Sequence, residues 1–269
     1  MDLDGFAHRR NFASYSGAAQ AGIRVILIFY AFAREVRPFK RRLKGRSALG
    51  IAGLNGFRAW LGSTQVIGVA TGIGMRRAAE VAGRALDTIP APALIIAVGV
   101  AGALRETLRV GDIVLADKLI VDPPHDAAII ALPSADLARF AAVLARQDVK
   151  FATGPILTVP QVLETSAAKR SAAAASGALA VDMESAAVAA AAHRRGLRFA
   201  CVRAVFDTLD EEVVGAGLAG PDGEVKPLAA AGFILRHPAA ILQLPAMLRS
   251  MNRAAAALAP ALEALASAW

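Results

Sequence analysis

The stretch QVIGVATGIGMRRAAEVAGRALDT, residues 65–88, joins two kinds of secondary structure across a glycine-rich turn. Its first six residues are rich in Val and Ile, which is typical of a strand buried on both faces. From Arg76 onward it is Ala-rich and favours a helix. Between the two, Thr71-Gly72-Ile73-Gly74 lets backbone amides approach a ligand at a helix N-terminus, where anions are favoured. Arg77 stands where the dinucleotide-binding fingerprint would have its third glycine, so the turn is not that fingerprint.

The same alternation continues through most of the chain. We expect strands at residues 25–32, 65–70, 93–100, 112–121, 150–159, 178–181 and 198–206. We expect helices at residues 76–88, 134–147, 162–176 and 183–195. Strands that alternate with helices favour an α/β fold, here a mixed, mostly parallel central sheet flanked by helices in a three-layer sandwich. No linker or internal repeat divides the sequence, so residues 22–269 are predicted to form a single domain.

The composition is that of a folded protein. Hydrophobic residues make up 56% of the 269 residues and charged residues 19%, which excludes an intrinsically disordered chain. The net charge is +8, but the basic run 34–46 contains a single aromatic residue, Phe39, and is interpreted as a solvated helix face. We therefore expect no nucleic-acid partner. A single cysteine, Cys201, cannot form an internal disulfide, and the four histidines have no metal-ligand spacing.

The two ends of the chain differ from its middle. Residues 1–21 are predicted to be a loose extension, with a weak hint of an export signal at Arg9-Arg10. The tail from about 226 combines apolar clusters with basic residues and is interpreted as a pair of helices packed on the core. The alternative is an apolar groove or a surface that touches lipid, because basic amphipathic helices bind anionic interfaces. We expect a cytoplasmic protein without a spanning helix, with peripheral contact to the inner membrane left open.

Acidic residues follow two of the apolar runs. Asp182 and Glu184 flank Met183 after the run that ends at Val181, and Asp207 follows the run that ends at Phe206. The carboxyl ends of strands in open α/β sheets are where ligands bind, and Val98-Gly99-Val100-Ala101-Gly102 is predicted to lie at such an end. Carboxylates at a helix start also serve as simple caps, so spacing alone leaves a structural role open.

Taken in order, the segments 71–74, 98–102, 110–114, 181–184 and 203–207 resemble the nucleoside phosphorylase and nucleosidase superfamily. They span roughly residues 24–212, and the Met-Glu pair with the downstream Asp is the most specific part. The Ala-rich sequence after Asp182 and the apolar tail are most similar to the hopanoid-associated phosphorylases. This resemblance implies N-glycosidic cleavage of adenosylhopane, which releases adenine and a ribosyl or phosphoribosyl hopane. The alternatives are a hydrolytic nucleosidase for small 5′-modified adenosines, such as methylthioadenosine or S-adenosylhomocysteine, and a non-catalytic nucleoside-binding protein.

The resemblance also implies roles for individual residues. Glu184 would bind the ribose hydroxyls with Met183 against the sugar, Asp207 would protonate purine N7, and Glu35 would position an attacking water. An acid that delivers a proton to a leaving group contributes roughly 10²–10⁴-fold in rate. The predicted anion loop is Gly72, Gly74, Gly99 and Arg34. The predicted purine pocket is Val100, Ala101, Gly102, Val159, Val181 and Asp182.

Two positions depart from the phosphorylase pattern. Phosphorylases of this superfamily hold phosphate with an arginine and a hydroxyl residue, whereas this sequence has Ala97 and Val100 there. Their loss removes charge-assisted hydrogen bonds to phosphate, although Arg34 or Arg58 could replace them. The presence of Glu35 favours water as the nucleophile. The sequence leaves both water and phosphate open in this role. The resemblance implies no metal or redox cofactor, phosphate as a possible co-substrate, and assembly as a homo-oligomer.

Overall fold

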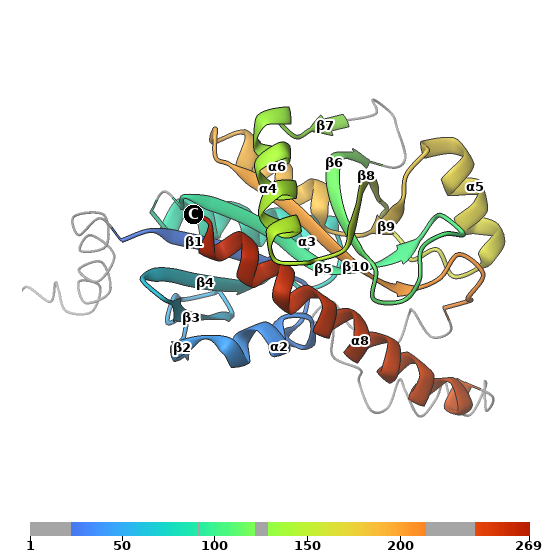
Figure 1. Ribbon diagram of the computed structural model, residues 1–269, viewed down its shortest axis with the longest axis horizontal. Helices are drawn as coiled ribbons and strands as arrows, with labels where there is room; N and C mark the ends of the chain where they lie inside the picture. Colours follow the sequence, from blue (N-terminus) through green and yellow to red (C-terminus); the bar gives the residue numbers. More distant parts are fainter. Residues whose placement is uncertain (1–22, 91, 122–128, 214–239) are drawn as a thin grey trace, which may run out of the picture.

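The computed structural model describes residues 23–90, 92–121, 129–213 and 240–269, and every named strand in these ranges joins one sheet (Figure 1). The strands are β1 (Val25–Tyr30), β2 (Lys44–Ala48), β3 (Gly56–Leu61), β4 (Thr64–Ala70), β5 (Leu94–Ala103), β6 (Ile113–Val121), β7 (Ile129–Ala131), β8 (Phe151–Thr158), β9 (Ala180–Asp182) and β10 (Phe199–Asp207). Their order is β10-β6-β8-β9-β5-β1-β4-β3-β2, with β7 beside β6.

Parallel pairing holds the centre of the sheet. Strand β1 lies between β4 and β5 and is parallel to both, and β10 is parallel to β5. Because β10 also pairs with β6, and β9 joins β8 to β5, these five strands close into a ring. All six residues of β1 are buried, as expected for a central strand covered on both faces.

Alternation of side chains along the central strands creates two cores. In β1, Leu27 and Phe29 face one core, while Ile26 and Ile28 face the other. The first core includes residues of α3 (Met75–Thr88) and α6 (Ser185–His193). The second includes residues of α2 (Ala33–Arg42), α4 (Ser134–Arg146) and α8 (Ala240–Ser267). Helix α5 (Ser166–Ser176) contributes Ala173 to a smaller cluster beside β8 and β9. The molecule is therefore a single α/β domain with helices on both faces of its sheet.

The predicted fold class is confirmed, and each expected strand and helix is present with its ends shifted by at most four residues. The largest shift is at α5, which begins at Ser166 instead of 162 because the Thr165 hydroxyl accepts the Ala168 N–H and caps the helix there. The glycine segment after residue 98 is not a loop, since β5 continues through it to Ala103. Pairing with β10 and β9 keeps the backbone of this segment extended.

Two features differ from the sequence interpretation. The basic run 34–46 is not one helix, because it divides between α2 and the exposed edge strand β2. Strands β2, β3 and β7 were not expected, since their sequences are short and mixed in polarity. The described part of the tail, residues 240–269, contains one long helix, α8, and the rest of the predicted pair of helices lies outside the described residues. The predictions for residues 1–21 and 226–239 lie outside the described residues.

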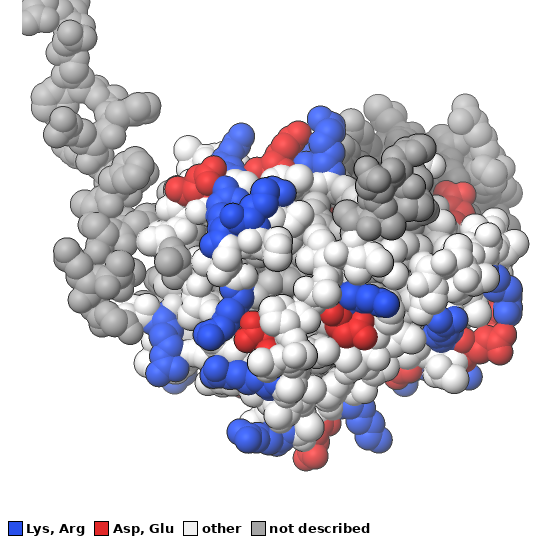
Figure 2. Space-filling model, turned by 90° about the horizontal axis from the view of Figure 1, so that it is seen from above, with Lys and Arg blue, Asp and Glu red and all other residues white. Residues whose placement is uncertain are grey.

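The surface carries its charge in small groups. Figure 2 shows Lys and Arg side chains separated by uncharged surface, with Asp and Glu beside several of them. Arg170, for example, pairs with Glu106 and Asp210. None of the helices within the described ranges is long and apolar enough to cross a membrane.

The packing of α8 gives a direct test of the second core. Leu258 is fully buried, whereas Leu248, ten residues earlier on the same helix, is 47% exposed. We expect Leu258→Ala to lower the free energy of unfolding by about 2–5 kcal/mol, because it leaves a cavity. Leu248→Ala should change it by no more than about 0.5 kcal/mol. Urea unfolding measures both, and equal losses would contradict the observed packing of α8.

Candidate active site

A cavity of about 220 Å³ lies at the carboxyl ends of β1, β5 and β10. Its lining within the described ranges includes four acidic residues and one basic residue, Lys169. The acidic residues are Glu35, Asp182, Glu184 and Asp207. The rest of the wall is almost entirely apolar and comes from Ala31, Phe32, Ile73, Val100, Ala101, Gly102, Val159, Val162, Leu163, Val181, Met183, Phe206, Val213 and Met251. An apolar cavity with a few convergent polar groups is the usual form of a small-molecule site.

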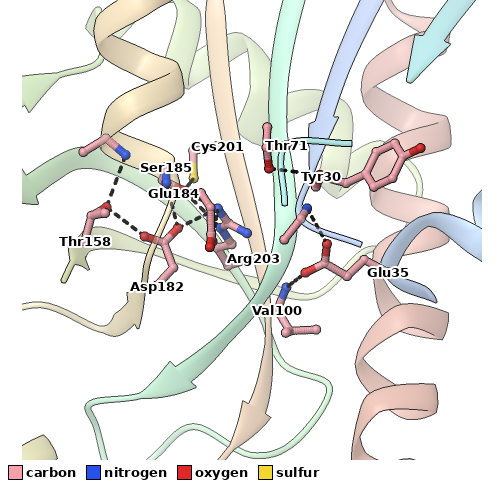
Figure 3. Close-up of polar contacts among 12 residues, drawn as sticks. Tyr30, Glu35, Thr71, Val100, Thr158, Asp182, Glu184, Ser185, Cys201 and Arg203 are labelled. Carbon is pink, nitrogen blue, oxygen red and sulfur yellow. Dashed lines mark hydrogen bonds and ion pairs between the residues drawn. The ribbon is translucent and has the colours of Figure 1, made fainter. Parts of the chain in front are cut away.

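The guanidinium of Arg203 lies behind this wall and holds two of the carboxylates (Figure 3). Arg203 projects from β10 and is only 2% exposed. Its Nη2 lies 2.6 Å from Asp182 Oδ2 and 3.9 Å from Glu184 Oε2. Its Nε and Nη2 also donate to the Ser185 hydroxyl, at 3.0 and 2.7 Å. A buried charge needs such partners, so Arg203 and the acidic residues stabilise one another.

Glycine at position 99 leaves the room that this arrangement needs. A Cβ atom there would lie 2.0 Å from Arg203 Nη1 and 2.6 Å from Glu35 Oε1. Strand β5 therefore passes close to both side chains only because residue 99 has none.

Glu184 lies between Arg203 and the start of α3. Its Oε1 accepts the Gly74 N–H at 2.8 Å, so the glycine turn after β4 places a backbone donor on this carboxylate. A carboxylate at a helix N-terminus is favoured by the helix dipole. Burial raises the pKa of Glu184 to about 7, although the charge of Arg203 opposes the rise. Glu184 is therefore a carboxyl group that exchanges its proton near neutral pH.

Glu35 is a buried carboxylate that receives three backbone N–H groups. Its Oε2 accepts from Ala31 at 2.8 Å and Phe32 at 3.1 Å, and its Oε1 accepts from Val100 at 2.9 Å (Figure 3). The bond to Phe32 caps the first turn of α2, so Glu35 also has a structural role. Burial raises the pKa of Glu35, while Arg203 and the three N–H groups oppose the rise.

Asp207 ends β10 on the other side of the cavity. The register of the sheet pairs it with Gly102, which in turn pairs with Val181 of β9. Its Oδ2 accepts from the ammonium of Lys169, a buried residue of α5. Burial raises the pKa of Asp207, and the Lys169 charge opposes the rise.

The structure brings most of the predicted residues together. Glu35, Met183, Glu184 and Asp207 all border the cavity, as do the six predicted for the purine pocket, Val100, Ala101, Gly102, Val159, Val181 and Asp182. Gly74 and Gly99 contribute through the contacts described above. Gly72 serves the fold, since its N–H donates to Ala31 at the end of β1.

The predicted arginines lie elsewhere. Arg34 is exposed on α2 and does not line the cavity. Arg58 projects from β3 and donates to the carbonyl of Leu49. The structure therefore brings neither arginine to the position where it would replace the phosphate-binding groups that are missing at Ala97 and Val100.

Two residues of the site were not predicted. The sequence does point to Arg203, because a cation in the middle of an apolar strand needs buried partners. It points less strongly to Lys169, which lies on the face of α5 that also carries the buried Ala173, four residues on. Within the described part of the chain, no group of three or more His, Cys, Asp or Glu residues could hold a metal ion.

Comparison with known proteins agrees with the fold and the motifs. Residues 25–226 match the model of the Phosphorylase superfamily, and the chain belongs to this superfamily. Its structure is similar to S-adenosylhomocysteine nucleosidase from Streptococcus pyogenes, with a TM-score of 0.67 and 23% identity over 90% of this chain and 97% of that one.

Two further solved structures are similar in the same way. Futalosine hydrolase of Helicobacter pylori has a TM-score of 0.66 at 19% identity, over 90% of this chain and 98% of that one. The 5′-methylthioadenosine/S-adenosylhomocysteine nucleosidase of Neisseria meningitidis has a TM-score of 0.67 at 18% identity, over 90% and 99%. At these identities the likeness shows the shared fold.

The raised pKa of Glu184 has a consequence for stability. Its value of about 7, against 4.5 as the ordinary value, means that the folded chain binds this proton more tightly than the unfolded chain. The stabilising contribution is complete below about pH 4.5 and is lost as the pH rises through about 7. Glu184→Gln removes this dependence. The free energy of unfolding of the variant, relative to wild type, should therefore rise by on the order of 3 kcal/mol across that range.

Urea unfolding at a series of pH values tests this prediction. Glu80→Gln, at an exposed acid of α3 paired with Arg76, is the control and should follow wild type at every pH. A constant difference between Glu184→Gln and wild type across the range would contradict the account of Glu184.

Proposed function

We propose that this protein hydrolyses the N-glycosidic bond of a 5′-modified adenine nucleoside. The observation that carries the proposal is a set of three carboxyl groups around one apolar cavity, those of buried Glu35 and Glu184 and partly buried Asp207. Such a set can protonate a leaving base, hold ribose hydroxyls and favour a cationic sugar.

In this proposal Asp207 acts on the base. Adenine leaves poorly as an anion, and a proton delivered to N7 lets it leave as a neutral molecule. Burial raises the pKa of Asp207, so the carboxyl group is a stronger candidate for proton donor than an exposed aspartate. Gly102, its register partner, leaves space beside it for a flat ring.

Glu184 and Glu35 act on the sugar and on the nucleophile. Cleavage develops positive charge on the ribose ring, and nearby carboxylates stabilise that charge. Glu184 is held by Gly74 and Arg203 in a position to accept hydrogen bonds from ribose hydroxyls. Glu35 is held by three backbone N–H groups and can accept a proton from an attacking water.

The charge of the cavity favours water over phosphate as the nucleophile. A phosphate ion would be repelled by Asp182 and by the ionised forms of Glu35 and Glu184. Within the described residues the only cation in the wall is Lys169, which already pairs with Asp207. The superfamily includes phosphorylases by name, but the expected arginine and hydroxyl at 97 and 100 are replaced by buried Ala97 and partly buried Val100.

The similar structures support the class of substrate. Their names describe nucleosidases for 5′-methylthioadenosine and S-adenosylhomocysteine and a futalosine hydrolase. We propose the same class of substrate for this protein, a nucleoside modified at its 5′ position.

We further propose that the 5′ substituent is a bulky apolar group, such as the polycyclic hydrocarbon of adenosylhopane. Helix α8 brings Met251 to the cavity. A second cavity of about 270 Å³ shares Phe206, Asp207 and Val213 with the first and is lined along α8 by Ala246, Met247 and Ser250, with Glu211 and Glu212 also in its wall. Together the two cavities offer space for a substituent too large for the first cavity alone, with apolar side chains along part of its length.

Substitution of the acid tests the proposed reaction. Asp207→Asn keeps the size of the side chain but removes the transferable proton, so kcat for adenine release from 5′-methylthioadenosine should fall about 10²–10⁴-fold. Asp210→Asn, at an exposed acid three residues on, is the control and should stay within about twofold of wild type. Calorimetry should show that Asp207→Asn still binds adenine. Full activity in Asp207→Asn would contradict the role of Asp207, and binding without release in wild type would indicate a nucleoside-binding protein.

Charge added along α8 tests the apolar substituent. Met247→Asp places a carboxylate in the second cavity, where it would have to be desolvated against a hydrocarbon. We expect kcat/KM for an adenosine with a long 5′-alkylthio chain to fall about tenfold or more, while kcat/KM for 5′-methylthioadenosine changes little. Asn252→Asp adds the same charge on an exposed position of α8 and should affect neither substrate. Equal losses on both substrates in Met247→Asp would contradict the proposed location of the substituent.

A further inference from the structure

Lys169 is a buried cation with a complete set of partners. Its side chain is 1% exposed, although it belongs to a helix whose other basic residue, Arg170, faces solvent. The ammonium donates to Asp207 Oδ2, to the carbonyl of Thr208 at 2.8 Å and to the carbonyl of Glu211 at 2.6 Å. Three donors thus meet three acceptors, and all three belong to the end of β10 and the segment after it.

The surroundings of Asp207 leave one oxygen available. Lys169 takes Oδ2, while Oδ1 makes no hydrogen bond to any described residue. The charged groups that act most strongly on Asp207 are Lys169 from α5 and Glu211 from the segment after β10, and Glu212 lines the second cavity with it. From β5 and β9 come Gly102 and Val181, which carry no charge. Lys169 is therefore the group that determines both the orientation and the electrostatic surroundings of this carboxyl.

We propose that Lys169 is a positioning residue for Asp207: it holds Oδ2 so that Oδ1 is directed to the purine, and its charge stabilises the carboxylate that remains after proton donation. This inference rests on the proposed function. In the step, the Oδ1–H bond of Asp207 breaks and an N7–H bond forms, while the electron pair of the C1′–N9 bond moves into adenine. Water adds to C1′ and releases a proton, and Asp207 takes up a proton from solvent for the next cycle.

The ammonium also sets the strength of the acid. A carboxyl group buried alone would hold its proton too firmly to donate it, because nothing would stabilise the resulting anion. A fixed cation against Oδ2 stabilises that anion and brings proton donation toward the operating pH, where general acid catalysis is most effective.

Lys169→Met tests the proposal, because it keeps an unbranched side chain of similar length and removes the charge. Loss of the cation should raise the pKa of Asp207 by about 1–3 pH units. Activity that requires protonated Asp207 falls on the alkaline side, so this limb of the kcat/KM profile for 5′-methylthioadenosine should move to higher pH by the same amount. At the pH optimum, kcat should fall about tenfold or more.

Arg170→Met is the matched control. Arg170 is the next residue of α5 and ties the same segment through Asp210, without contact to Asp207. It should leave the alkaline limb in place. Lys169→Arg keeps the charge and should also retain the wild-type limb, even if its kcat is lower. Lys169→Gln removes the charge but keeps N–H donors for the carbonyls, so it should move the alkaline limb to higher pH as Lys169→Met does, and it keeps the test available if Lys169→Met does not fold.

A second readout does not depend on activity. Titration of ¹³C-labelled aspartate, with the Asp207 signal assigned from Asp207→Asn, reports the pKa of this carboxyl directly. We expect it to rise in Lys169→Met and to be unchanged in Arg170→Met. An unchanged titration and an unchanged alkaline limb in Lys169→Met would overturn the proposal. The role of Lys169 would then be structural, to hold residues 208–211 in place. If wild type releases no adenine, the proposed function fails, and the titration still decides whether Lys169 controls Asp207.

Discussion

The buried ion pair between Arg203 and the carboxylates of Asp182 and Glu184 is the interaction on which the site depends. Carboxylates gathered in an apolar cavity repel one another and lose their hydration, so they need a fixed cation behind them. Arg203 supplies it from the central strand β10, and the Ser185 hydroxyl accepts from its Nε and Nη2. This arrangement requires glycine at position 99, because any side chain there would displace both Arg203 and Glu35. The chemistry of the cavity thus begins with one arginine and one glycine on neighbouring strands.

The curvature of the sheet turns these contacts into a site. Strands β5, β10, β6, β8 and β9 close into a ring, and the register at Gly102 brings Asp207 and Val181 to the same place from two strands. Helices then add their own groups at this edge. The start of α3 provides the N–H of Gly74, the first turn of α2 provides Glu35, and α5 provides Lys169. Each carboxyl is consequently held by an element of the fold and not by a free loop.

Much of this could be predicted from the sequence, and the reasons for the exceptions are physical. The buried strands and Ala-rich helices have strong local patterns, so their positions were predicted to within a few residues, and the resemblance pointed to Glu35, Met183, Glu184 and Asp207. Edge strands such as β2 have no such pattern, because neither face is buried. The closure of the ring depends on pairing between distant strands. Lys169 was not recognised as part of the site from its weak helical pattern, since a basic residue in an Ala-rich helix is ordinarily solvated and only the tertiary fold places it against Asp207.

Under the proposed function, water attacks the sugar in a cavity whose charge excludes phosphate. The measurement that decides this is the reaction of 5′-methylthioadenosine in ¹⁸O-labelled water with and without phosphate, followed by mass spectrometry of the sugar product. We expect ¹⁸O at C1′ of a free ribosyl product and a rate of adenine release that is independent of phosphate. A phosphorylated ribosyl product that forms only when phosphate is present would contradict it. Such a result would mean that a cation from outside the described cavity wall completes an anion site.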